Sequence, residues 1–298
     1  MLTGFAILAD GLVYAAYLFI VAIGLTLIFG VMKILNVAHG SFYTFGAYGA
    51  ATAVGIYFDR GLPEAGGFLL MILFAMALGL ALGLILERGV MRLVYGRDEV
   101  VMVLVTYAAF LILEDLVMLV WGLGSYATYQ PLLAAGKIEI GELVLSNYDL
   151  GLILVAAVLA AASYRGLKFT RYGRLLTAVI FDRETAAAFG IDVKVVYTVT
   201  FAIGAMLGAL GGAIMAPKIS VTLGIGVEVI VLAFAVVAIG GMGSIEGALV
   251  GALIVGICRA AAVHLVPQVE LFVIYGVMAL VLMIRPYGLF VRAQPRKI

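Results

Sequence analysis

Few residues of this 298-residue sequence could do chemistry. It has two histidines, His39 and His264, and a single cysteine, Cys258, which can form no internal disulfide. The pattern His-Glu-x-x-His is absent and the scattered carboxylates complete no ligand set, so we predict no metal site. The phosphate loop Gly-x-x-x-x-Gly-Lys-[Ser/Thr] is also absent, so we expect this chain to bind no ATP or Mg itself.

The elements that must position these groups are apolar. The sequence is 65% hydrophobic and 12% charged, with a mean hydropathy of +1.23. A helix of ~20 residues crosses the ~30 Å hydrocarbon core and satisfies its own backbone there. We therefore predict an all-α polytopic membrane protein, a single domain over residues 1–298 with about eight or nine spans. The predicted spans are 8–32, 40–57, 66–86, 100–121, 149–164, 194–216, 226–240, 247–265 and 268–285.

Positive charge is unevenly divided between the two sides of the predicted topology. Of the 18 Lys and Arg residues, 14 lie on one side, at Lys33, in 88–97, in 165–194 and in 285–297. Lys and Arg concentrate in cytoplasmic loops, so this side and the C-terminus are predicted to be cytoplasmic. A net charge of +1 excludes a nucleic-acid footprint.

Two polar residues mark a possible break in the first helix. Asn36 and His39 are three residues apart, on one face if helical, and precede Gly40 and Tyr43. Ionisable residues inside a membrane often line a pathway, and a broken helix frees backbone groups for a ligand. We predict either that these four residues line the translocation path or its gate, or that the polar pair satisfies buried backbone. Residues 240–247 offer a second possible break.

Two carboxylates, Glu114 and Asp115, lie about 10 Å inward from Trp121 at 1.5 Å per residue. They could pair with Arg259, which lies within a predicted span, or extend toward the interface. His264 is predicted to be interfacial.

Six of the Lys and Arg residues fall between Arg165 and Lys194, between two apolar spans. We predict an amphipathic helix there, with Leu175, Leu176, Val179 and Ile180 on one face and Arg171 and Arg174 among the headgroups. A short helix and a forced turn should follow, formed by Asp182, Arg183, Glu184, Thr185, Ala186 and Gly190. Such a segment is either a docking loop for a water-soluble partner or an ordinary interfacial helix.

Small residues recur every four positions along three predicted spans. They are Ala75, Gly79 and Gly83, then Gly204, Gly208 and Gly212, then Gly243, Gly247 and Gly251. Such stripes let helix backbones approach closely in lipid, so we predict that these residues pack between helices.

Two longer motifs resemble the permease subunits of branched-chain amino acid ABC importers. They are GLTLIFGVMKILNVAHGSFY at 24–43 and AIGGMGSIEGA at 238–248, and with the loop between them the similarity spans nearly the whole chain. The resemblance implies a coupling helix at Glu184-Thr185-Ala186-x-x-x-Gly190, matching a Glu-Ala-Ala pattern followed by Gly, with Thr185 in place of the first Ala.

The resemblance also implies partners. They are a second homologous permease, two ATP-binding cassette subunits that hold ATP and Mg, and an extracytoplasmic solute-binding protein, all at a bacterial inner membrane. The implied solute is a branched-chain or similar amino acid. An ion-coupled secondary transporter, with His39, Glu114 and Asp115 as a proton relay, and a simple channel are the alternatives, but neither needs a docking loop.

Overall fold

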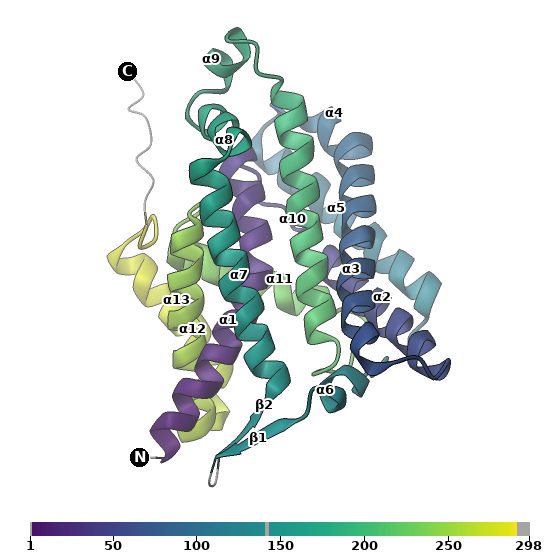
Figure 1. Ribbon diagram of the computed structural model, residues 1–298. Coiled ribbons are helices and arrows are strands. Elements are labelled where there is room, and N and C mark those ends of the chain that lie inside the picture. Colours follow the sequence, from purple (N-terminus) through teal and green to yellow (C-terminus); the bar gives the residue numbers. More distant parts are fainter. Residues whose placement is uncertain (1, 141–142, 291–298) are drawn as a thin grey trace.

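The computed structural model describes residues 2–140 and 143–290 and is dominated by long helices (Figure 1). In the first half these are α1 (Leu2–Met32), α2 (His39–Asp59), α3 (Glu64–Leu86), the π-helical turn η1 (Glu87–Met91), α4 (Arg92–Val94), α5 (Glu99–Trp121), α6 (Gln130–Ala135) and the antiparallel strands β1 (Lys137–Ile140) and β2 (Leu143–Ser146). The second half contains α7 (Asn147–Phe169), α8 (Arg171–Phe181), α9 (Arg183–Ala188), α10 (Val193–Met215), α11 (Ile225–Gly240), α12 (Ile245–Leu265), the 3-10 turn η2 (Pro267–Val269) and α13 (Glu270–Ile284).

Six helices within the described residues are long and apolar enough to cross a membrane: α1, α3 with its extension to Val94, α5, α7, α10 and α12. Helices also occupy the other three predicted spans, but α2 is less apolar and α11 and α13 are shorter. The multi-pass architecture is therefore confirmed, whereas the number of crossings beyond six stays a prediction.

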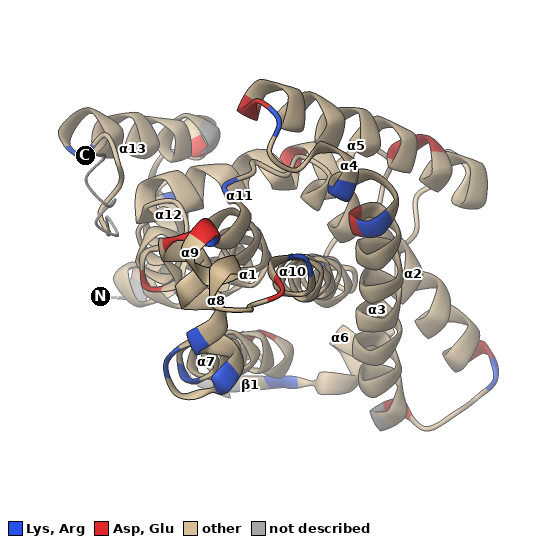
Figure 2. Cartoon of the chain, turned by 90° about the horizontal axis from the view of Figure 1, so that it is seen from above, with Lys and Arg blue, Asp and Glu red and all other residues tan. Residues whose placement is uncertain are grey.

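Helix α1 lies at the centre of the bundle. It packs against α12, α10, α7 and α11, and Figure 2 shows these helices surrounding it. In the apolar segment of α1, 72% of the residues are buried, whereas in that of the peripheral α7 only 11% are buried. Helix α10 joins this centre to α2 and α3. At the upper end in Figure 1 lie α4, α8 and α9, and at the lower end α6 and the β1–β2 hairpin.

Glycines on α10 allow close contacts with α1 and α2. A Cβ at Gly204 would lie 2.6 Å from the Ile28 side chain, and one at Gly208 would lie 2.9 Å from Cε1 of His39. At Gly212 it would overlap the carbonyl oxygen of Tyr43. Any larger residue at these positions would have to push the helices apart.

The predicted breaks occur where helices end. Helix α1 ends at Met32 and α2 begins at His39; helix α11 ends at Gly240 and α12 begins at Ile245. Gly243 approaches Gly30, and a Cβ on either Gly240 or Gly247 would overlap the backbone of the other. Gly251 continues this contact to the carbonyl oxygen of Val236. The two breaks therefore lie beside each other and are flanked by close backbone contacts.

The pairing considered for Arg259 is wrong. Its guanidinium forms an ion pair with Glu270, across the turn between α12 and α13, and lies 3.9 Å from the ring centroid of Tyr14. Glu114 instead accepts hydrogen bonds from the Thr44 hydroxyl and the Gly224 amide, at 3.1 and 3.2 Å. Arg259 lies in the last two turns of α12, where Glu270 at the start of α13 is the adjacent carboxylate.

Candidate coupling surface and helix break

Local hydrogen bonds define the single-turn helix α9. One carboxylate oxygen of Asp182 accepts from the amides of Glu184 and Thr185, each at 3.0 Å, and the other accepts from the Thr185 hydroxyl at 2.5 Å. This is the N-cap arrangement that satisfies free amides at a helix start. These hydrogen bonds, led by that from the Thr185 hydroxyl, hold the pKa of Asp182 below its ordinary value. At the other end, Gly190 has φ +83°, a left-handed conformation that favours glycine.

The exposed surface of α9 differs in detail from the predicted one. Glu184, Thr185 and the alanines at 187 and 188 are exposed, whereas Ala186 is buried inside the chain. Ala186 therefore packs against its own chain, and its predicted part in coupling to an ATPase subunit stays a prediction. Phe189, which was not singled out from the sequence, is 82% exposed. In the sequence, its exposure was indicated only by the position of an aromatic residue directly before a forced turn.

Helix α8 precedes α9 and packs on the bundle through an apolar face and the hydroxyl of Tyr172. Leu176 and Val179 are buried and Ile180 packs partly buried against the core, as predicted, but Leu175 is exposed and the buried Gly173 lies on the inward face instead. The Tyr172 hydroxyl lies 3.1 Å from the Val196 carbonyl oxygen and 2.9 Å from Oγ1 of Thr200, both on α10. A displacement of α8 would therefore act directly on α10.

A buried carboxylate connects α10 to the end of α3. The Glu87 side chain is fully buried and accepts hydrogen bonds from the hydroxyls of Thr198 and Tyr95, at 2.9 and 3.3 Å, and from Nε of Arg92 at 3.4 Å. Arg92 also donates to the Thr198 hydroxyl at 2.9 Å. Glu87 begins η1, and such π-helical turns are frequent at functional sites. This cluster was missed from the sequence, where its only trace was an acid and an arginine closing an apolar span.

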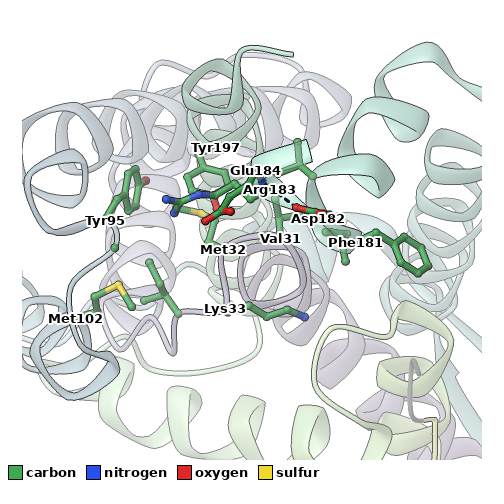
Figure 3. Close-up of a pocket in the computed structure, with 14 residues that line it drawn as sticks. Val31, Met32, Lys33, Tyr95, Met102, Phe181, Asp182, Arg183, Glu184 and Tyr197 are labelled. Carbon is green, nitrogen blue, oxygen red and sulfur yellow. Dashed lines mark hydrogen bonds between the residues drawn. The ribbon is translucent and has the colours of Figure 1, made fainter. Parts of the chain in front are cut away.

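A pocket of about 470 Å³ joins the α8–α9 segment to the end of α1 (Figure 3). Its walls come from residues 31–34, from Tyr95, Gly96 and Met102, from residues 179–184 and from Tyr197. Figure 3 shows Arg183 and Glu184 reaching over Met32 toward Tyr95 and Tyr197. Movement of α9 would therefore change the shape of a space bounded by the broken helix.

The broken helix itself is held by α5. Lys33 has φ +55° and is the only non-glycine residue with a positive φ among the residues that the structure describes. The Thr106 hydroxyl accepts a hydrogen bond from the amide of Val37 at 3.3 Å, and it shares its own proton between the Val103 and Leu35 carbonyl oxygens, at 2.9 and 3.3 Å. These bonds satisfy part of the backbone that the break leaves without helical partners.

The predicted pathway residues all lie inside the protein. Asn36, His39, Gly40 and Tyr43 are buried, and Nε2 of His39 lies 3.0 Å from the Val21 carbonyl oxygen. Asn36 precedes α2, so the two polar residues do not share a helical face. Within the part of the chain that is described, the Asn36 amide and Nδ1 of His39 have no hydrogen-bond partner. Their role in a pathway stays a prediction.

A mostly helical bundle with several apolar helices long enough to cross a membrane defines the class, a multi-pass membrane protein. The strands β1 and β2 depart from the all-α prediction. The family model "Branched-chain amino acid transport system / permease component" matches residues 7–282, and the chain belongs to this family. It is thus a permease subunit of an ABC importer.

Individual relatives agree with this assignment over nearly the full length. The chain is 28% identical to the high-affinity branched-chain amino acid transport system permease protein BraD of Pseudomonas aeruginosa, over 98% of this chain and 97% of that protein. It is 27% identical to the permease protein LivH of Escherichia coli K12, over 94% and 92%. The solved structure of PsaBC from Streptococcus pneumoniae in complex with Fab has a TM-score of 0.50 at 12% identity, covering 93% and 91%, which shows similarity of fold alone.

Proposed function

We propose that this permease forms, with a second homologous permease, the pathway for branched-chain or similar amino acids across a bacterial inner membrane. Two ATP-binding cassette subunits, holding ATP and Mg, drive it, and an extracytoplasmic binding protein delivers the solute. The names of BraD and LivH support the solute class. The positive charge around α4, α8 and α9 supports a cytoplasmic position for that end and for the C-terminus.

One observation supports the coupling role: α9 has a defined start and end and is exposed. Its start is capped by Asp182 and its end is the turn at Gly190, while Glu184 and Phe189 are exposed. Through Tyr172, the neighbouring α8 is hydrogen-bonded to α10. ATP-driven movement of a subunit docked on α9 would thus reach the centre of the bundle.

The test is a pair of substitutions on this surface. Gly190→Val strains the turn, since a β-branched residue at positive φ is a genuine outlier, and Glu184→Lys reverses an exposed charge. Both variants should insert in the membrane and retain the second permease, but lose co-purifying ATPase subunits and solute-stimulated ATP hydrolysis in proteoliposomes.

Matched controls lie at the other end of the bundle. Gly61 also has positive φ, at +66°, with open space around it, and Glu64 is also an exposed acid in the first turn of a helix. Gly61→Val and Glu64→Lys should leave hydrolysis and uptake unchanged. Normal coupling in both Gly190→Val and Glu184→Lys would refute the proposal, and uptake that persists without ATP at a clamped potential would favour the ion-coupled carrier.

A further inference from the structure

Helix α5 lies at the edge of the bundle, on the opposite side from α7 (Figure 2). It packs mainly on α2, and a row of polar contacts holds it there. The Ser41 hydroxyl donates to the Phe110 carbonyl oxygen at 3.4 Å, and Nε1 of Trp121 donates to the Thr52 hydroxyl at 2.8 Å. Together with the bonds of Thr106, this row fixes which face of α5 points inward.

The opposite face of α5 is exposed along its length. Leu104, Leu111 and Leu119 are 59%, 47% and 81% exposed, and Asp115, on the same face, is exposed as well. Asp115 lies six residues before Trp121, about 9 Å along the helix, inside a candidate membrane span. No hydrogen bond or ion pair of Asp115 occurs within residues 2–140 and 143–290.

A second exposed carboxylate lies on the neighbouring helix. The bond from the Gly224 amide to Glu114 places the start of α11 beside α5. One turn into α11, Glu228 is exposed between Val227 and Val231, which are 49% and 40% exposed. The outer face of α5 and the start of α11, which we term the α5–α11 face, thus combines apolar side chains with two exposed carboxylates.

Hydrocarbon cannot cover this face as it covers other exposed helices. Helix α3 also exposes large apolar side chains, including Leu69 and Leu73, yet no charged residue occurs between Glu64 and Glu87. Carboxylates inside a membrane face a bundle interior or water, where donors can solvate them. The α5–α11 face therefore needs a covering that is apolar like lipid and also supplies donors or water.

We propose that the α5–α11 face is the surface on which the second permease packs, with Asp115 and Glu228 turned toward the solute pathway between the two subunits. This inference rests on the proposed function. A helical membrane subunit supplies both the apolar contact and the hydrogen-bond donors. A second copy of this chain would bring the same two acids to the shared pathway, where like charges repel, so a different homologous chain is the better match.

Photocrosslinking in the intact complex tests the assignment. A photoreactive amino acid is placed at Leu111 or Val227 on the proposed interface, and at Leu73 or Leu154 as matched exposed apolar positions on α3 and α7. We expect the first pair to crosslink to the second permease at a yield at least tenfold above the second pair. Crosslinks to the second permease from Leu73 or Leu154 would overturn the inference, as would crosslinks from Leu111 to another copy of this chain.

Access of water gives a second readout. In a background with Cys258→Ser, which removes the sole native thiol, Asp115→Cys should react with a charged, membrane-impermeant thiol reagent at least tenfold faster than Leu73→Cys. Equal and slow reaction at both positions would overturn the pathway assignment. Failure of the proposed function would appear elsewhere, as a purified chain without ATPase subunits, whereas failure of this inference leaves an assembled complex joined through another face.

Discussion

A very close contact between helix backbones offers a quantitative test of how α2 and α10 pack. Gly46 on α2 faces Ala209 on α10, where an added Cβ would overlap the Ala209 carbonyl oxygen and lie 2.6 Å from its Cα. Ordinary Cβ contacts begin at 3.4 Å, so Gly46→Ala must move the two backbones apart by roughly an ångström. Gly55, on the same helix, has no such neighbour within 4 Å and provides the matched control.

The expected magnitude follows from two opposing effects. Separation by roughly an ångström forfeits a quarter to half of each dispersion contact, and overpacking of this kind costs about 1–3 kcal/mol. Replacing a helical glycine with alanine also gains about 1 kcal/mol, but this gain is shared by Gly46→Ala and Gly55→Ala. The difference between the two variants should therefore be about 1–3 kcal/mol in the free energy of unfolding.

Fluorescence of Trp121 suits the assay, because it is the only tryptophan and packs against Phe45 and Tyr48 on α2. Thermal unfolding in detergent should show Gly46→Ala melting several degrees below Gly55→Ala, given about 2–4 °C per kcal/mol in a chain somewhat smaller than this one. Equal midpoints for the two variants would show that α2 and α10 are not in backbone contact.

Three further predictions concern single groups. His39→Leu should slow solute uptake in proteoliposomes while leaving assembly intact, and unchanged kinetics would remove His39 from the pathway. Glu87→Gln, which turns a buried acceptor of three donors into an amide, should cost about 1–3 kcal/mol and lower the unfolding midpoint, whereas an unchanged midpoint would mean that Glu87 is not buried. Asp182→Ala should expose α9 to proteolysis where Asp182→Asn does not. The Asp182 pKa is lowered in the folded chain, so the cap is fully present above the ordinary carboxyl pKa of about 3.9 and is lost only as pH falls through the lower pKa of the folded state. Cleavage of the native chain should therefore not change between about pH 8 and 5. Increased cleavage at pH 5 would contradict this.

Features that depend only on residues close together in the chain were predicted correctly from the sequence. Apolar runs predicted the long helices, and the helix breaks near Asn36 and Gly240 followed from polar and glycine residues inside those runs. The short helix after Asp182 and the turn at Gly190 were predicted, because a left-handed glycine needs only neighbouring residues.

What the sequence could not supply was the rotation and pairing of helices. Leu175 is exposed although it was predicted on the apolar face of its helix, and Ala186 is buried in its own chain. Burial depends on the neighbouring elements, which periodicity does not identify. The pairing of Arg259 with Glu270 depends on how η2 turns the chain, and one of the donors to the buried Glu87 is Thr198, which is 111 residues away. Each is a tertiary contact without a local signature.

The central position of α1 has a consequence for biogenesis. Helices α10 and α12, its main neighbours, follow it by more than 150 residues in the chain. At 5–20 residues per second, translation reaches them roughly 10–50 s after α1 has entered the bilayer. During that interval lipid must solvate every side of a helix that ends up buried in protein. The absence of charged residues from Gly11 to Met32 meets this requirement, so α1 is apolar all round because its first environment is lipid and its last is the bundle core.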